Sequence, residues 1–242
     1  MKPILIAKVG STVDRLLHRR GDFHDWLREL LDRDEETTLV REPQHGDEFP
    51  ELDEINGVIV TGASAMITDE ADWSLRAEAW LSRALEARIP ILGICYGHQM
   101  LARIAGGHVD WNPNGREIGT VGVELFESAR EDVLFRDMPL SLNVQTTHSQ
   151  SVIELPPGAT LLGRNGHDAH QAFALGDHAW GVQFHPEFDA DVLRGYLHDR
   201  REAITEEGID VEARLSGTHD SDHGRQLLQS FEAIVRARAL AY

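Results

Sequence analysis

The chain has 242 residues, of which 41% are hydrophobic, and this is enough for one sizeable hydrophobic core. Lys and Arg total 23 against 41 Asp and Glu, and the formal net charge of −18 argues against nucleic acid and acidic membrane surfaces as partners. A single cysteine excludes an internal disulfide, and no apolar run reaches the ~18 residues of a membrane span or suits a signal peptide, so we expect a soluble, cytoplasmic protein.

The first hundred residues alternate between strand-like and helix-like patterns. Short apolar runs predict buried strands at 3–10, 37–42, 56–64 and 89–94. Amphipathic patterns predict helices at 22–31, 72–88 and 96–107. Asp22 is a candidate N-cap of the first helix, and paired glycines end the third. This alternation implies right-handed crossovers and a mainly parallel sheet that helices cover on both faces.

The second half of the chain has a different pattern. Residues 108–184 contain short strand-like runs such as 120–126, 159–165 and 179–185, which we interpret as a β-rich elaboration of the same domain. Two helical patterns follow, at 189–208 and 222–240, separated by the polar stretch 209–221.

We therefore predict a single domain over residues 1–242, with a core at 1–190 and a helical C-terminal extension at 190–242. The predicted fold class is α/β, a three-layer sandwich with a mainly parallel central sheet and additional C-terminal helices.

The only cysteine lies in Gly93-Ile94-Cys95-Tyr96-Gly97, where an apolar strand ends and a helix begins. This pattern is typical of a nucleophile elbow, a strained turn that tolerates almost no side chain two residues away on either side. Gly93 and Gly97 meet that demand. The start of the following helix favours the thiolate, and backbone N–H groups beginning with Tyr96 can receive a developing oxyanion. A buried cysteine beside glycines that serve tight packing is the alternative interpretation.

A candidate base and its carboxylate partner occur together at 180–188. His185 and Glu187 are two residues apart, so a strand that continued through them would place both side chains on the same side. A carboxylate beside an imidazole fixes its tautomer and stabilises the imidazolium. Among 13 histidines a His-x-Glu pair alone is a weak signal, but together with the elbow it indicates a cysteine nucleophile with its base.

The segments Gly-Ile-Cys-Tyr-Gly-His-Gln (93–99) and Gly-Val-Gln-Phe-His-Pro-Glu (181–187) resemble the two signature segments of the class I glutamine amidotransferases. This family has a flavodoxin-like fold and includes the glutaminase part of GMP synthase, and the resemblance spans roughly residues 1–190. It implies that Cys95 attacks the side-chain amide of glutamine to form a γ-glutamyl thioester and release ammonia. His185 would transfer the proton and Glu187 would hold His185. No cofactor is implied.

The resemblance also implies an oxyanion hole. Gly62 and Ala63 occupy the place of the loop that supplies the second donor, and Tyr96 N–H would supply the other. The segment Val-Thr-Gly-Ala-Ser-Ala-Met-Ile-Thr-Asp (60–69) departs from the usual Gly-Gly-Pro-x-Ser run of the family, with Ala63, Ser64 and Met66 replacing the more typical residues. An ordinary strand-to-helix turn is the alternative interpretation.

Three further residues occupy positions that contact the amino-acid end of glutamine in similar enzymes: Gln99, His148 and Ser149. Gln99 as a helix cap and His148 as a hydrogen-bonded loop residue are open alternatives. His167 and His170 have no third ligand at suitable spacing, so no metal site is predicted.

Three functions follow from these motifs. Fewer than sixty residues follow the His-Pro-Glu segment, and none resembles a phosphate-binding loop, so a glutamine-hydrolysing amidotransferase would need a separate synthetase as partner. The alternative is a γ-glutamyl hydrolase or peptidase that accepts other γ-glutamyl small molecules. A non-catalytic regulatory module is disfavoured by the intact Cys-His-Glu set. A homo-oligomer is compatible with the sequence.

Overall fold

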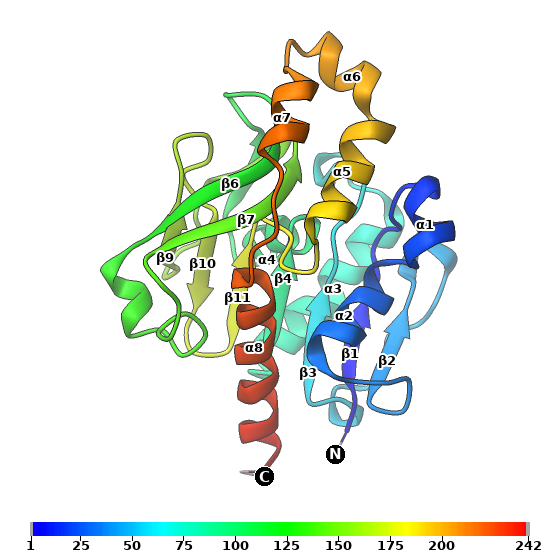
Figure 1. Cartoon of the computed structure of the whole chain (residues 1–242). Coiled ribbons are helices and arrows are strands. Elements are labelled where there is room, and N and C mark those ends of the chain that lie inside the picture. Colours follow the sequence, from blue (N-terminus) through cyan, green and yellow to red (C-terminus); the bar gives the residue numbers. More distant parts are fainter. Residues whose placement is uncertain (1, 241–242) are drawn as a thin grey trace.

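The computed structural model describes residues 2–240. Within them, nine strands form one sheet in the order β2 (Thr38–Arg41), β1 (Ile4–Ala7), β3 (Gly57–Val60), β4 (Ile91–Ile94), β11 (Ala179–Val182), β10 (Ala172–Leu175), β9 (Thr160–Arg164), β6 (Glu117–Leu125) and β7 (Ser141–His148) (Figure 1). Neighbours from β2 to β11 are parallel, and neighbours from β11 to β7 are antiparallel. A separate antiparallel pair consists of β5 (His108–Trp111) and β8 (Gln150–Glu154).

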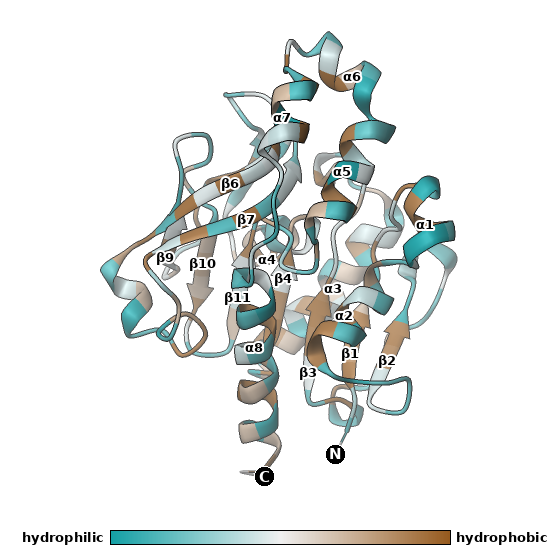
Figure 2. Cartoon of the chain, in the orientation of Figure 1, coloured by the Kyte–Doolittle hydropathy of each residue, from teal (hydrophilic) through white to brown (hydrophobic). Residues whose placement is uncertain are grey.

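The helices are α1 (Asp14–Arg20), α2 (Phe23–Leu31), α3 (Asp72–Glu86), α4 (Tyr96–Ile104), α5 (Ala190–Asp199), α6 (Arg201–Glu206), α7 (Val211–Gly217) and α8 (His223–Leu240). Residues on β1 alternate between two apolar clusters because successive side chains of a strand point to opposite faces. Ile4 and Ile6 pack with α2 and α8, whereas Leu5 and Ala7 pack with α3 and α4. The predicted α/β sandwich with both faces covered is therefore confirmed, and Figure 2 shows hydrophobic strands between helices of mixed polarity. Nowhere in residues 2–240 is a helix both long enough and apolar enough to cross a bilayer.

The predicted strands and helices of the first hundred residues are present with shorter bounds. Asp22 caps α2 in a capping box with Asp25, as its position before the apolar pattern indicated. The short helix α1 was not predicted, because its sequence is mostly polar and Leu16 is its one buried residue.

The C-terminal prediction is wrong in two places. The expected helix at 189–208 is divided at Arg200 into α5 and α6. The expected polar separator at 209–221 contains α7, whose start is capped by the Asp210 carboxylate accepting from Ala213 N–H. Only Val211 of α7 is buried, so its helical pattern is too weak to detect without its packing partners.

Helices α5, α6 and α7 form a roof, defined here as residues 190–217, which stands beyond the carboxyl ends of the parallel strands (Figure 1). The roof packs on β6 through an apolar cluster that consists of Ile118, Leu193, Leu197, Ile204 and Val211. This cluster fixes the roof on the sheet, next to the turn that follows β4.

Helix α4 lies unusually close to the sheet. A Cβ added to Gly97 would collide with the carbonyl oxygen of Val60 in β3, and one added to Gly93 would collide with the backbone of Gly97. Both glycines are therefore required by the approach of α4 to β3 and β4.

Gly97→Ala is expected to lower the free energy of unfolding by about 1–3 kcal/mol or more, because the new methyl group overpacks against backbone that cannot rotate away. Urea denaturation measures this change. Gly122→Ala is the control, since a Cβ at this position in β6 meets nothing within 4 Å and should not lower stability. A Gly97→Ala protein as stable as the parent would contradict the close packing.

Candidate active site

Cys95 occupies the turn between β4 and α4. Its backbone has φ 52° and ψ −98°, a conformation that is unfavourable for any residue with a side chain. The Cys95 N–H donates to Val182 O at 2.9 Å, which ties the turn to the end of β11. The residue is 6% exposed, and its sulfur lies 3.9 Å from Thr147 O. The cysteine thus lies at the strained strand-to-helix turn that the elbow pattern predicted.

His185 and Glu187 meet, but not by the expected route. Strand β11 ends at Val182, so the expectation that a strand continues through both residues is wrong. Instead, the His185 N–H donates to Gln145 O of β7 at 2.8 Å in an isolated bridge. The ring Nδ1 lies 2.8 Å from Glu187 Oε1, and both residues are buried.

An aromatic stack holds the His185 ring in place. Its centroid is 4.1 Å from that of Phe188, with an angle of 18° between the planes. Phe188 in turn stacks on Tyr196 of α5 at 5.1 Å and on Phe23 of α2 at 6.1 Å. Sequence reasoning missed Phe188, although its position directly after Glu187 was an available signal.

The charges of this group favour a thiolate and an imidazolium. Burial alone raises the pKa of the Cys95 thiol, but the charge of His185 and then that of His148 outweigh burial, so the pKa is lowered. Burial lowers the pKa of His185, but the negative charges of Glu187 and Cys95 are stronger and raise it to about 10. The thiol and the ring titrate as a coupled pair, and the charged form of both is favoured at neutral pH.

The loop after β3 lies against the cysteine and the histidine. A Cβ added to Gly62 would be 2.7 Å from His185 Cε1 and 3.6 Å from Cys95 Cβ. Ala63 and Tyr96 line the same cavity as Cys95. Across residues 2–240 the N–H groups of Ala63 and Tyr96 donate to no backbone acceptor, so both can serve a ligand. The Tyr96 hydroxyl is remote from this role, because it bonds to Ser74 Oγ at 2.8 Å and burial raises its pKa to about 12.

The cavity beside Cys95 is small, with a volume of about 30 Å³. Gln99, His148 and Ser149, the predicted substrate contacts, all line it. Gln99 Nε2 donates to Gln150 O at 2.8 Å and to Gln183 Oε1 at 3.1 Å, so Gln99 bridges to β8 and does not cap its helix. Sequence reasoning missed two cationic residues that also line the cavity: Arg116 and Arg200.

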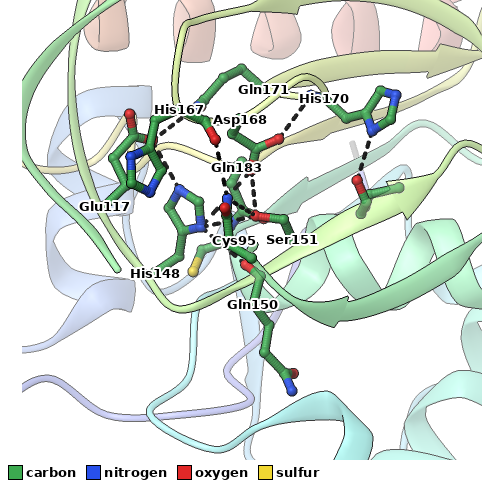
Figure 3. A network of polar contacts seen from close by, with 12 residues as sticks. Cys95, Glu117, His148, Gln150, Ser151, His167, Asp168, His170, Gln171 and Gln183 are labelled. Carbon is green, nitrogen blue, oxygen red and sulfur yellow. Dashed lines mark hydrogen bonds and ion pairs between the residues drawn. The ribbon is translucent and has the colours of Figure 1, made fainter. Parts of the chain in front are cut away.

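His148 belongs to a buried polar network beside Cys95 (Figure 3). Its Nε2 lies 3.0 Å from Glu117 Oε2, and its Nδ1 lies 3.0 Å from Gln150 O. Glu117 also accepts from Asn165 Nδ2 and Gln171 Nε2, each at 2.6 Å.

The surroundings of Glu117 and His148 favour the charged form of both side chains. Burial opposes the charge of His148, but the hydrogen bond to Glu117 and the charge of Asp168 raise its pKa above the ordinary value. Burial likewise raises the pKa of Glu117, and the stronger effect of His148 lowers it. His148 therefore brings a second positive charge close to the thiol, which no sequence motif had indicated.

His167 and His170 take part in backbone contacts, with His167 Nε2 at 2.9 Å from Gly115 O and His170 Nδ1 at 2.6 Å from Val152 O. Among the residues that the structure describes, no group of three or more His, Cys, Asp or Glu side chains is arranged to hold a metal ion.

The fold and this site together define an α/β protein with a buried cysteine at a strained strand-to-helix turn and a bonded pair of histidine and glutamate. Residues 23–199 match the sequence model of the family Glutamine amidotransferase class-I, and the chain belongs to that family.

Relatives with curated names include two kinds of enzyme. Gamma-glutamyl peptidase 5 of Arabidopsis thaliana is 30% identical over 151 residues, which are 60% of this chain and 60% of that protein. The glutamine-hydrolyzing GMP synthase of Bacillus subtilis is 31% identical over 202 residues, which are 80% of this chain but 35% of that protein. The chain therefore spans only part of the length of these relatives.

A solved glutamine amidotransferase from Thermotoga maritima superimposes with a TM-score of 0.76 over 97% of this chain and 98% of its own, at 23% identity. This likeness shows that the fold of the described residues is shared with that protein over 97% of the chain.

Glu117→Ala should lower the free energy of unfolding by about 3–5 kcal/mol, because it leaves the buried charge of His148 without its partner. Glu124→Ala is the matched control, since Glu124 is exposed on the same strand and its removal should change stability by less than about 0.5 kcal/mol. Urea denaturation at neutral pH measures both. Equal stability of the two variants would mean that the buried pair is not charged.

His185→Gln should raise the pKa of the Cys95 thiol, because burial then acts without the opposing imidazolium. The thiolate predominates only above the pKa of the thiol. We therefore expect iodoacetamide to alkylate the variant at least ~10-fold more slowly at pH 7, and the pH–rate profile of the variant to inflect at a higher pH. Cys95 is the only cysteine, so the alkylation rate reports it directly. His45→Gln, at an exposed histidine, is the control. An unchanged inflection in His185→Gln would rule out the proposed charge coupling.

Proposed function

We propose that the chain hydrolyses the side-chain amide of glutamine through a γ-glutamyl thioester on Cys95. The observation that carries the proposal is a buried cysteine at a strained turn, next to the same glycine as an imidazole that Glu187 holds at 2.8 Å. The lowered pKa of the thiol agrees with this geometry. A thiolate of this kind is a strong nucleophile at neutral pH, and the neighbouring imidazolium is positioned to protonate the leaving group. Membership of the class I family supports the same chemistry.

In the proposed reaction Cys95 Sγ attacks the amide carbon, and the carbonyl oxygen becomes an oxyanion that accepts from Tyr96 N–H and from the loop at Gly62 and Ala63. The carbon–nitrogen bond then breaks, and the nitrogen leaves as ammonia after taking a proton from His185. A water molecule gives a proton back to His185 and attacks the thioester carbon, which releases glutamate and regenerates the thiolate. Glu187 holds the tautomer and orientation of the ring throughout.

We further propose a domain organisation and a partner for this chain. Residues 1–242 act as one domain, with a core at 1–190 and the C-terminal helices at 190–242. The ammonia passes to a separate synthetase in the cytoplasm. The GMP synthase relative supports this arrangement, because this chain corresponds to 35% of that longer protein.

A second candidate, hydrolysis of larger γ-glutamyl amides, is favoured by a specific feature. A cavity of about 390 Å³ lies next to the one at Cys95 and shares Arg116 and Ser149 with it. Its remaining lining includes Trp111 and Asn112. This space would accommodate a substrate larger than glutamine, as the name of the Arabidopsis relative suggests for that protein.

Intact-mass spectrometry and product analysis separate the candidates. The parent protein and Cys95→Ala are incubated with glutamine and with a panel of γ-glutamyl dipeptides, and released glutamate, ammonia and amine are quantified. We expect the parent to turn over at least one substrate and to show a glutamyl adduct on Cys95, and Cys95→Ala to show neither. Ammonia release from glutamine favours the first candidate, and faster release of amino acid from dipeptides favours the second. Turnover that persists in Cys95→Ala would overturn both.

A further inference from the structure

Arg200 brings a positive charge to the cavity from outside the segment that matches the family. The match ends at residue 199, and Arg200 lies at the junction of α5 and α6 in the roof. Its Nη2 donates to Ser64 Oγ, in the loop after β3, at 3.0 Å. Its guanidinium carbon lies 5.2 Å from the centroid of the Tyr196 ring. These contacts hold the guanidinium at the cavity that contains Cys95.

The other cationic side chains of the cavity are already neutralised. Arg116 forms a bidentate pair with Glu207, with distances of 2.7 and 2.8 Å. His148 is paired with Glu117 at 3.0 Å. Arg200, by contrast, has no carboxylate within 4.0 Å anywhere in residues 2–240. The charge of Arg200 does act on Glu207, where it helps to lower the pKa, but both oxygens of that carboxylate bond to Arg116. The guanidinium of Arg200 therefore has no carboxylate of its own and is available to a ligand.

We propose that Arg200 binds the α-carboxylate of the γ-glutamyl substrate and thereby selects glutamyl compounds over amides that lack this group. The inference deepens the proposed function and rests on it. A γ-glutamyl compound carries its α-carboxylate at the end opposite the amide that Cys95 attacks, and that anion loses hydration when the substrate enters the cavity. A partly buried carboxylate needs a charged partner, and a guanidinium supplies two parallel N–H donors.

The packing of the roof fixes the position of the Arg200 guanidinium before a substrate binds. The apolar cluster that contains Ile118, Leu193 and Ile204 packs the roof on β6. The ion pair between Arg116 and Glu207 connects the residue just before β6 to the C-terminal end of α6. Arg200 lies in the chain between Leu193 and Ile204, both of which belong to this cluster. It is therefore positioned by packed helices, and little ordering of the arginine is required when a substrate binds.

Steady-state kinetics of Arg200→Gln test the assignment. Glutamine, or the γ-glutamyl dipeptide that is turned over best, is compared with the matching amide that lacks the α-carboxylate; for glutamine this is 4-aminobutanamide. We expect KM for the glutamyl substrate to rise ~10- to 100-fold with little change in kcat, as for the loss of a charged hydrogen bond that acts in binding. The ratio kcat/KM for the decarboxylated amide should not change.

Two further variants guard against a purely structural effect. Arg200→Lys should recover part of the lost affinity, because it restores the charge without the planar guanidinium. Arg201→Gln is the matched control, since the neighbouring Arg201 is exposed and pairs with Glu212 on the surface. It should leave both KM values unchanged.

A binding measurement that needs no turnover completes the test. L-glutamate should protect Cys95 from iodoacetamide, and the concentration for half-protection should rise ~10- to 100-fold in Arg200→Gln but not in Arg201→Gln. Equal losses with both kinds of amide, or unchanged protection in Arg200→Gln, would overturn the role of Arg200 while the hydrolysis stands. Arg200-dependent protection in a parent protein without turnover would overturn the hydrolysis and support the binding role.

Discussion

The parallel pairing of β4 with β11 brings the two halves of the site together. Val182 is the register partner of Ile94, and the Cys95 N–H continues the ladder by donating to Val182 O. The strained turn at Cys95 and the segment that leads to His185 therefore begin directly after the paired residues Ile94 and Val182. A residue with positive φ costs about 1–3 kcal/mol, and it persists only where the surroundings leave no alternative. Here the surroundings are α4, β3 and β4, which contact one another closely at Gly93 and Gly97.

The imidazole of His185 is held by contacts from several directions. Gln145 of β7 fixes its backbone, Phe188 covers one face of the ring, and Glu187 bonds to Nδ1. The chain uses elements far apart in sequence for this purpose, because Phe188 itself rests on α2 and α5. The result is a ring with little freedom to turn, and a fixed ring can exchange protons with a fixed sulfur without first being ordered.

Local patterns predicted the elements whose packing is also local. The apolar strands, the amphipathic α3 and the Gly-x-Cys-x-Gly turn each carry their signal within a few residues, and the observed sheet agrees with the prediction. The pair of Glu117 and His148 could not be predicted from local patterns. It depends on the antiparallel register of β6 and β7, in which these two residues are direct partners. Glycines at 119 and 122 weaken the alternation that would have indicated this register. The division at Arg200 and the helix α7 depend in the same way on packing against β6.

The burial of the single cysteine has a further chemical consequence. Oxidation of a low-pKa thiol produces a sulfenic acid, which a second cysteine can protect from further oxidation by forming a disulfide. These 242 residues contain no second cysteine, so this protection has to come from a thiol outside them. Because Cys95 is only 6% exposed, a small thiol molecule reaches its sulfur more easily than a protein thiol does. The same burial hinders large reductants and large oxidants alike, so it favours small molecules as the redox partners of Cys95 in both directions.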